Sequence, residues 1–265
     1  MLLIADSGST KTDWIFCTPE KGVVKMISSV GFNPIVQSVN FIREQIKEAF
    51  DGVVEVENVK NIYFFGAGCS SEDRRNIIKN ILKEVFLNAE IEVDHDMKAA
   101  VIATCGDDAG FSCILGTGSN AVFYDGKSIV EPKGALGIGY ILGDEGSGSA
   151  IGKIILRDYL YQQMPEDIYL HFKEVLKLEK DVIFKNVYQL PNANTYLATF
   201  TREIYAFRES EYVQNVVKNV FAEFFKYNIL PYQKDKKLPV HFIGSIALHF
   251  EKELHRKRYL LDYYM

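Results

Sequence analysis

The chain contains the same short pattern twice, and this repeat restricts its fold more than any other feature. The stretch "LLIADSGSTKTDWIFCTPEKGVVKM", from residue 2, reads as strand, polar glycine turn, strand, tight turn and strand. "FSCILGTGSNAVFYDGKSIVEP", residues 111–132, contains the same elements in the same order. Two copies of a three-stranded meander joined to β–α units predict a duplicated α/β fold rather than a run of plain βαβ units.

The segments around the two copies alternate between strand and helix patterns. Apolar periodicity and turn residues predict helices at 39–50, 70–86 and 97–105, and strands at 61–68, 91–95 and 238–245. Ser70 and Asp73 resemble a capping box at the start of the second helix. Because the chain after about residue 146 is mostly helical, we expect two domains, 1–108 and 109–265, of which the second is rich in helix.

Composition restricts the partners and the location of the protein. The net charge is -5 over 265 residues and the basic runs are short, so a nucleic-acid partner is not expected. The start lacks a basic region and no apolar run reaches about 18 residues, so we expect neither a signal peptide nor a membrane span. Four scattered cysteines without a C-x-x-C pair disfavour a zinc ribbon. Together these features favour a cytoplasmic protein with free thiols.

The polar turn after the first strand has more hydrogen-bonding groups than a hairpin needs. Two residues suffice for a hairpin turn, whereas this one has a glycine, several hydroxyl groups and a lysine. Backbone N–H groups of a glycine turn can hold phosphate oxygens, and hydroxyl and ammonium groups add donors. We therefore predict a phosphate-binding turn formed by Gly8, Ser9, Thr10, Lys11 and Thr12. Asp6, at the end of the strand, is the predicted Mg²⁺ ligand, directly or through water.

The second copy carries a matching turn. "LGTGSN" supplies Gly116, Thr117, Gly118 and Ser119 as a second predicted phosphate turn. Its glycine spacing also fits a dinucleotide motif, but strand residues follow where that motif requires a helix. "GSGSAIGKI", from residue 146, lacks the required residues of a P-loop. "GAGCSS", from residue 66, does lie between a strand and a helix, so dinucleotide binding stays a rival interpretation there.

Three further stretches contain candidate polar ligands. In "DHDMKAA", Asp96 can cap the helix that follows or accept a proton from a hydroxyl group. "YILGDEGSGSAIG" places Asp144 and Glu145 where carboxylates could bind neighbouring hydroxyls of a sugar. In "GFNP", Asn33 belongs to a turn and could also offer a donor and an acceptor to a polyol.

Six motifs in this order resemble the BadF/BadG/BcrA/BcrD-type ATPase family, with the greatest likeness to N-acetylglucosamine kinases and their bacterial relatives. They are "DSGSTKT", "GFNP", "DHDMKAA", "LGTGSN", "LGDEGSG" and "FIGSIA". These proteins belong to the sugar kinase, actin and Hsp70 superfamily. The resemblance implies a duplicated ribonuclease H-like (actin-like ATPase) fold, with two domains around a nucleotide cleft. The two turns would then hold one triphosphate between them.

The resemblance also implies roles for individual residues. Asp96 would be the base that faces the sugar hydroxyl, and Gly244 and Ser245 would lie near the adenosine of ATP. Asn33, Asn120, Asp144 and Glu145 would bind the sugar. Leu136 stands in "GALGIG", from residue 134, where kinase relatives tend to place an aromatic residue, and this departure leaves the identity of the sugar open.

The implied activity is ATP-dependent phosphorylation of a sugar or amino sugar, with Mg²⁺ as a cofactor. The resemblance is compatible with a homodimer. One alternative is an ATPase that drives a partner enzyme through an iron–sulfur cluster, for which Cys105 and Cys113 are the only cysteines close together in the sequence. Another is a sensor that binds sugar or nucleotide without catalysis.

Overall fold

The protein consists of two compact units, Met1–Ile102 and Ala103–Met265. The computed structural model describes residues 1–8, 10–130, 137–232 and 238–258, with the side chains of 255–258 excepted. The domain boundary expected from the sequence, between residues 108 and 109, stays a prediction.

The first unit is built on a five-stranded mixed sheet in the order β3-β2-β1-β4-β5. β1 (Leu2–Ser7), β2 (Lys11–Thr18) and β3 (Gly22–Val30) form an antiparallel meander. β4 (Asn61–Gly66) and β5 (Glu90–His95) continue the sheet in parallel with β1. The parallel strands β1, β4 and β5 therefore all end at the same edge of the sheet.

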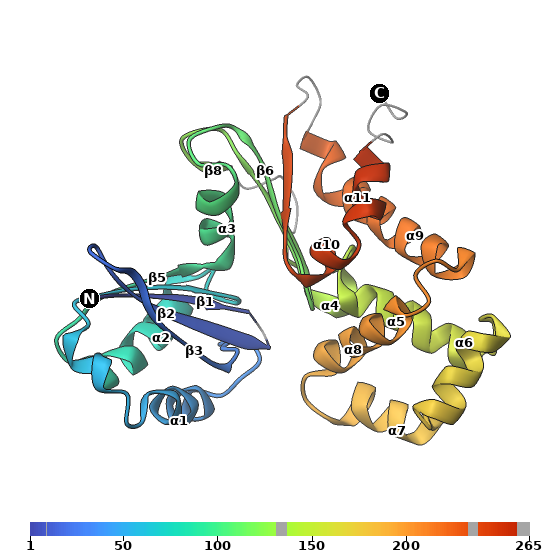
Figure 1. Ribbon diagram of the computed structural model, residues 1–265, viewed down its shortest axis with the longest axis horizontal. Helices are drawn as coiled ribbons and strands as arrows, with labels where there is room; N and C mark the ends of the chain where they lie inside the picture. Colours follow the sequence, from blue (N-terminus) through green and yellow to red (C-terminus); the bar gives the residue numbers. More distant parts are fainter. Residues whose placement is uncertain (9, 131–136, 233–237, 259–265) are drawn as a thin grey trace. The chain divides into compact units, whose positions relative to one another are not determined.

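Helices cover one face of this sheet. α1 (Val39–Phe50) and α2 (Glu72–Val85) lie together on that face in Figure 1, a 3-10 turn η1 (Val54–Asn58) precedes β4, and α3 (Asp96–Thr104) follows β5. Alternate residues of a strand point to opposite faces, so Leu3, Ala5 and Ser7 are buried against the helices and Asp6 points to the other face.

Aromatic rings fill the core of the first unit. Trp14 is fully buried and lies edge-on to Phe50, with ring centroids 4.8 Å apart. Edge-to-face pairs of this kind add to the free energy that burial alone provides. The core fixes the sheet against α1 and α2 and so fixes the edge at which β1, β4 and β5 end.

The second unit repeats the same sheet topology. β6 (Gly110–Leu115), β7 (Ser119–Tyr124) and β8 (Ile129–Val130) form an antiparallel meander, and β9 (Val240–Ile243) lies parallel to β6. The strand order β8-β7-β6-β9 matches the order β3-β2-β1-β4 of the first unit. The duplicated fold expected from the sequence repeat is therefore confirmed.

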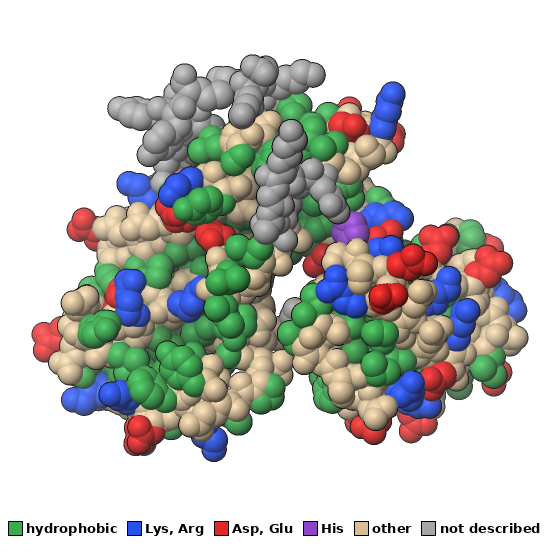
Figure 2. Space-filling model, turned by 180° about the vertical axis from the view of Figure 1, so that it is seen from behind, with side chains coloured by type: hydrophobic (Ala, Val, Ile, Leu, Met, Phe, Trp, Pro, Cys, Tyr) green, Lys and Arg blue, Asp and Glu red, His purple; other side chains and the backbone are tan. Residues whose placement is uncertain are grey.

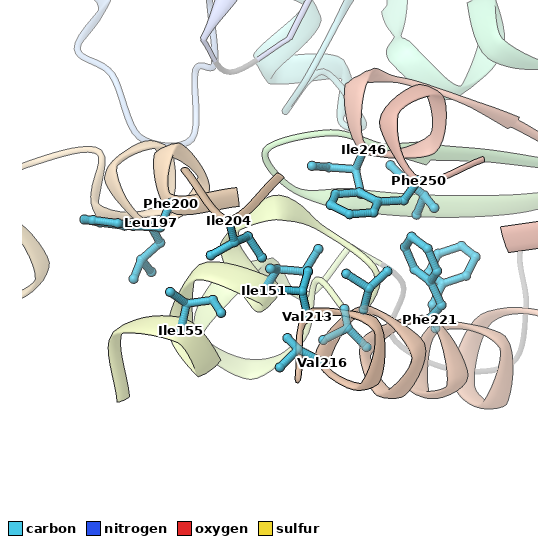
Figure 3. Packing of buried hydrophobic residues seen from close by; sticks show 14 of the residues in the cluster. Ile151, Ile155, Leu197, Phe200, Ile204, Val213, Val216, Phe221, Ile246 and Phe250 are labelled. Atoms are coloured by element: carbon cyan, nitrogen blue, oxygen red, sulfur yellow. The ribbon is translucent and has the colours of Figure 1, made fainter. Parts of the chain in front are cut away.

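Helices make up most of the rest of the second unit. In chain order they are α4 (Gly139–Leu142), α5 (Gly148–Leu160), α6 (Glu166–Leu170), η2 (His171–Val175), α7 (Lys180–Phe184), η3 (Lys185–Gln189), α8 (Ala193–Tyr205), α9 (Glu211–Asn228), η4 (Leu230–Tyr232), α10 (Ser245–His249) and α11 (Glu251–Arg258). Figure 3 shows apolar side chains of α5, α8, α9 and α10 packed together, among them Ile151, Phe200, Phe221 and Ile246. This core holds the start of α5 against the sheet.

The predicted helix at 39–50 is confirmed with the same bounds as α1, whereas the predicted capping box of α2 is wrong. The helix begins at Glu72, and the side chain of the preceding Ser71 makes no capping bond. Instead, the Arg74 guanidinium donates to the hydroxyls of Ser70 and Ser71, each at 2.8 Å. A guanidinium has five donors, and here it takes both hydroxyls that could have capped the helix.

The surface of the protein carries charges of both signs. On the face shown in Figure 2, Lys and Arg side chains are interspersed with Asp and Glu. None of the helices in the described ranges is long and apolar enough to cross a membrane.

Gly152 lets α5 and α8 touch along their backbones. A Cβ atom at this position would collide with the backbone carbonyl of Leu197 in α8. Backbone cannot move aside as the end of a flexible side chain can, so this contact requires glycine.

Gly152→Ala is therefore expected to lower the free energy of unfolding by about 2–3 kcal/mol through overpacking. Urea unfolding of the full chain measures this. Gly106→Ala is the control, because a Cβ there meets no atom within 4 Å and only the φ of +57° opposes it; its expected cost is about 1 kcal/mol. Equal costs for the two variants would contradict the close-contact explanation.

Candidate active site

The first predicted phosphate turn joins β1 to β2, and buried hydroxyl groups hold its base. The Gly8 N–H donates to the Lys11 carbonyl at 2.9 Å. The hydroxyls of Ser7 and Thr12, both fully buried, are 2.7 Å apart. The Ser7 hydroxyl also accepts from the Phe32 N–H at 3.1 Å. Thr12 therefore points into the core, and its predicted contact with phosphate stays a prediction.

The remaining predicted residues of this turn differ in position. Gly8, Thr10 and Lys11 are exposed, whereas Ser9 lies outside the described residues. Lys11 forms an ion pair with Asp13 at 2.8 Å. An exposed ion pair of this kind is weak, so Lys11 can exchange its carboxylate partner for a phosphate at little cost.

Two carboxylates face each other at the base of the turn. Asp6 and Asp13 are register partners on β1 and β2. Desolvation, with a further contribution from the Asp13 charge, raises the pKa of Asp6. Hydrogen bonds from Lys11 and Ser28 lower the pKa of Asp13. Asp6 is thus the carboxylate of this pair whose charge is less well balanced by neighbouring groups.

Asp96 begins α3, directly after β5. Its carboxylate accepts from the Met97 N–H at 2.9 Å, which is a local contact at the helix start. Burial raises the pKa of Asp96, and the Asp6 carboxylate raises it further. Because β1 and β5 end at the same edge of the sheet, the structure brings the predicted base into the electrostatic range of the predicted metal ligand.

Asn33 lies in the connection from β3 to α1, close to Gly68 in the loop after β4. Its side-chain oxygen accepts from the Ile35 N–H at 3.0 Å. A Cβ at Gly68, where φ is +77°, would collide with that oxygen, and a Cβ at Gly66 would collide with the Phe64 ring. These close approaches account for both glycines of "GAGCSS" without a dinucleotide.

The second predicted phosphate turn, between β6 and β7, is bonded to the start of α5. The Gly116 N–H donates to the Gly118 carbonyl at 2.9 Å and closes the turn. The N–H groups of Gly148 and Ser149 donate to the carbonyls of Gly116 and Thr117, at 2.8 and 3.1 Å. The motifs "LGTGSN" and "LGDEGSG" therefore form one structural unit.

Asp144 and Glu145 are part of the same unit. The Ser119 hydroxyl donates to the Glu145 carbonyl at 2.6 Å. Asp144 has a left-handed backbone with φ of +60°. A Cβ added to Gly118 would lie 2.8 Å from the Asp144 Oδ2 atom. The predicted sugar ligands thus lie directly against the predicted phosphate turn.

Burial raises the pKa of Asp144 to about 6. The Ser119 N–H and the charge of Lys153 act in the opposite direction, and the charge of Glu145 adds to the rise. The carboxylate is therefore ionised at neutral pH but costs free energy in that form.

Asn120, the last predicted sugar ligand, is in β7, one residue after the turn. Its side-chain oxygen accepts from the Ala121 N–H at 2.9 Å. A Cβ added to Gly137 would lie 3.7 Å from the Asn120 amide nitrogen. Leu136, beside it, lies outside the described residues.

Gly244 and Ser245 connect β9 to α10 and border a cavity of about 840 Å³. Gly244 has φ of +104°, and a Cβ there would collide with the Leu115 carbonyl at the end of β6. The cavity is also lined by Thr104, Phe225 and Phe242. Gly244 therefore lies against the end of β6, the strand that leads into the second turn.

Each unit therefore brings together its own share of the predicted residues. The first unit groups the turn of residues 6–12 with Asp96, and the second groups Gly116–Ser119 with Asp144 and Gly244. That both turns bind one triphosphate stays a prediction. The sequence reasoning missed the Ser7–Thr12 pair, although alternation with Leu3 and Ala5 already indicates that Ser7 faces the core.

The described residues contain no group of three or more His, Cys, Asp or Glu side chains placed to bind one metal ion. A magnesium ion at Asp6 would therefore take its other ligands from phosphate and water, as Mg²⁺ commonly does. The unbalanced charge of Asp6 fits such an ion.

Each unit has a sheet that combines an antiparallel meander with parallel strand pairing, and a glycine turn follows its first strand. This duplicated architecture is that of the actin-like ATPases and sugar kinases. No family model matches the sequence, and the search of curated proteins finds no match either.

A solved structure from Porphyromonas gingivalis, provisionally named an N-acetylglucosamine kinase, is 36% identical. The match covers 97% of this chain and 92% of the other, with a TM-score of 0.87. This chain belongs to the BadF/BadG/BcrA/BcrD-type ATPase family, among its N-acetylglucosamine kinase-like members.

Two more distant structures have the same fold. One, from Chromobacterium violaceum, is also provisionally named an N-acetylglucosamine kinase; it is 15% identical over 96% of this chain and 90% of its own, with a TM-score of 0.69. The other, from Listeria monocytogenes, is provisionally named an N-acetylmannosamine kinase; it is 12% identical over 97% and 88%, with a TM-score of 0.51.

Asp144→Asn is expected to raise the free energy of unfolding at pH 7.5 by about 1–2 kcal/mol. The folded protein holds this carboxylate at a pKa of about 6, above the ordinary 3.8, so the ionised form destabilises it. The gain should shrink as the pH falls through 6 and vanish below about 4, where the wild-type carboxyl is protonated in the folded and unfolded states. Denaturant unfolding at pH 7.5, 5.5 and 4 measures this.

Asp125→Asn is the control for that series. Asp125 is in the exposed turn after β7, and hydrogen bonds from the backbones of Ser128 and Lys127 lower its pKa. Its neutralisation should therefore lower the stability at pH 7.5, opposite in sign to the change at Asp144. A gain at Asp144 that is the same at all three pH values would contradict the burial argument.

Proposed function

We propose that this protein transfers a phosphoryl group from ATP to a hydroxyl of a sugar or amino sugar, as an N-acetylglucosamine kinase would. The observation that carries the proposal is the 36% identity, over 97% of this chain, with the Porphyromonas gingivalis protein provisionally named for that activity. The two glycine turns, which follow the first strand of each repeated sheet, support it. Such an enzyme would work in the cytoplasm.

The two turns would bind the phosphates. Phosphoryl transfer depends mainly on alignment and on neutralisation of charge. Thr10 and Lys11 are exposed and would supply hydroxyl and ammonium donors in the first turn, whereas the Gly8 N–H already donates to the Lys11 carbonyl. In the second, the bonds from Gly148 and Ser149 fasten the loop to the start of α5, so less ordering would be needed on binding.

Asp96 would remove the proton from the attacking hydroxyl. Burial and the Asp6 charge raise its pKa above that of an ordinary aspartate, which makes it a stronger base. A positioned general base contributes about 10²–10⁴-fold in rate. Asn33, Asn120, Asp144 and Glu145 would orient the sugar, and their amide and carboxylate groups suit hydroxyl partners.

Magnesium is expected near Asp6. Desolvation and the Asp13 charge raise the pKa of this carboxylate, so its negative charge is poorly balanced by neighbouring groups. A bound Mg²⁺ would offset phosphate charge. The adenosine would occupy the cavity beside Gly244 and Ser245, where Phe225 and Phe242 offer apolar surface.

The iron–sulfur alternative receives no support from the cysteines. Cys105 and Cys113 are both buried inside the second unit, and burial raises the pKa of the Cys113 thiol far above its usual range. A cluster at a subunit interface needs accessible thiolates. An iron–sulfur absorbance band would revive this alternative, and a lack of sugar-stimulated ADP release would favour the sensor.

The direct test is ADP production by the purified full chain with ATP and Mg²⁺ in the presence of single sugars. N-acetylglucosamine, N-acetylmannosamine and glucose form the first panel. Stimulation of ADP release by one of them supports the proposal, and identical rates with and without each sugar would refute a kinase for these sugars. A homodimer stays a separate prediction.

Asp96→Asn is expected to lower sugar-dependent turnover by at least about 100-fold while ATP affinity changes little, because the amide cannot accept the proton. Coupled ADP assays and calorimetry measure the two quantities. Asp94→Asn is the matched control: it removes the same charge two residues away, where the carboxylate pairs with Lys98 at 2.7 Å. If Asp96→Asn turned over at the rate of Asp94→Asn, Asp96 would have no part in the reaction.

A further inference from the structure

The connection from β3 to α1 is closed by the side chain of one glutamine. The Gln37 Oε1 atom accepts from the Asn33 N–H at 2.9 Å, and its Nε2 atom donates to the Gly31 carbonyl at 2.9 Å. A backbone N–H can only donate and a carbonyl can only accept, so these two partners fix the orientation of the amide. One side chain thus binds the backbone on both sides of Phe32.

These two bonds have the pattern of a neighbouring strand. In a parallel sheet, one residue donates to the carbonyl before its partner and accepts from the N–H after it. The Gln37 amide does the same around Phe32, directly after the end of β3 at Val30. Asn33 also precedes Pro34, which favours an extended backbone at Asn33. The amide therefore takes the place of a sheet neighbour where the sheet itself has ended.

Asn33 is held at its other polar groups as well. Its carbonyl accepts from the N–H groups of Val36 and Gln37, each at 3.1 Å. Its side-chain oxygen accepts from the Ile35 N–H at 3.0 Å, and a Cβ at Gly68 would collide with that oxygen. The position of this side chain therefore depends on the backbone of the loop, which Gln37 closes.

The middle of the loop is anchored in the core independently of Gln37. Phe32 is fully buried, and its ring centroid lies 6.1 Å from that of Trp14. Its N–H donates to the Ser7 hydroxyl at 3.1 Å. Loss of the Gln37 amide would therefore leave Phe32 in place and release the backbone bond at Asn33.

We propose that Gln37 is a positioning residue of the sugar site, and that its amide holds Asn33 where Asn33 binds the sugar. The inference rests on the function proposed above and deepens it. Both ends of the Gln37 amide are bonded to backbone, so Gln37 acts through Asn33 and not on the sugar directly. Without the amide, Asn33 would have to be ordered when the sugar binds, and this ordering would weaken sugar binding.

The test is the steady-state kinetics of the full chain with N-acetylglucosamine, N-acetylmannosamine or glucose, whichever wild type phosphorylates. Gln37→Met keeps the length of the side chain and loses both hydrogen bonds. It is expected to raise the KM for the sugar about 3–10-fold, the equivalent of one neutral hydrogen bond, while kcat and the KM for ATP change less than about twofold.

Two further variants calibrate this result. Gln45→Met is the matched control and should behave as wild type, because the Gln45 amide only donates to Glu48 on the exposed side of α1, at 2.9 Å. Gln37→Glu keeps an acceptor for the Asn33 N–H and loses the donor to Gly31, so its sugar KM should lie between those of wild type and Gln37→Met. A sugar KM as high as that of Gln37→Met would contradict the role of the Asn33 bond.

A double-mutant cycle tests whether Gln37 acts through Asn33. Asn33→Ala alone is expected to raise the KM for the sugar about 3–10-fold. Adding Gln37→Met to Asn33→Ala should raise it by less than about twofold more, because the group that Gln37 positions is already gone. Effects that multiply in the double variant would overturn the proposal.

Hydrogen exchange reads the contact itself, without substrate. The Asn33 amide proton should exchange at least about tenfold faster in Gln37→Met than in wild type, whereas the Phe32 amide proton, bonded to Ser7, should change little. Equal exchange of the Asn33 amide in the two proteins would refute the contact whatever the activity.

The outcomes separate the two proposals. If wild type phosphorylates a sugar and Gln37→Met has the sugar KM of Gln45→Met, the positioning role is refuted and the kinase function stands. If wild type phosphorylates none of the three sugars, the function proposed for them fails, and the inference fails with it.

Discussion

The backbone hydrogen bonds between the β6–β7 turn and the start of α5 are the constraint on which the second unit's site depends. Gly148 and Ser149 give their N–H groups to the turn carbonyls, and the Ser119 hydroxyl donates to the Glu145 carbonyl. The first N–H groups of a helix normally lack partners within the helix. Here they fasten a loop, so the helix start positions the turn instead of binding a ligand itself.

In the first unit, side chains rather than backbone groups hold the glycine turn in place. The buried hydroxyls of Ser7 and Thr12 bind each other, and Ser7 accepts from the Phe32 N–H. Buried polar groups are costly unless they are paired, so this arrangement ties the hairpin to the connection that carries Asn33. The two copies of the motif share a sheet topology but are held in place by different interactions.

The sequence predicts periodic and repeated features well and long-range close contacts poorly. The duplicated sheet and the bounds of α1 follow from alternation, helical periodicity and turn residues, which are local properties. The capping box of α2 failed because Arg74, four residues from Ser70, takes the hydroxyls. The contact between Asp144 and the turn joins residues more than twenty positions apart, and no spacing rule in a single sequence indicates it.

The packing of Gly244 on the Leu115 carbonyl has a mechanical consequence. The turn that borders the large cavity and the strand end that leads into Gly116 touch through backbone, with no side chain between them that could change rotamer. A change of side-chain rotamer alone therefore cannot alter the distance between the Gly244 turn and the end of β6.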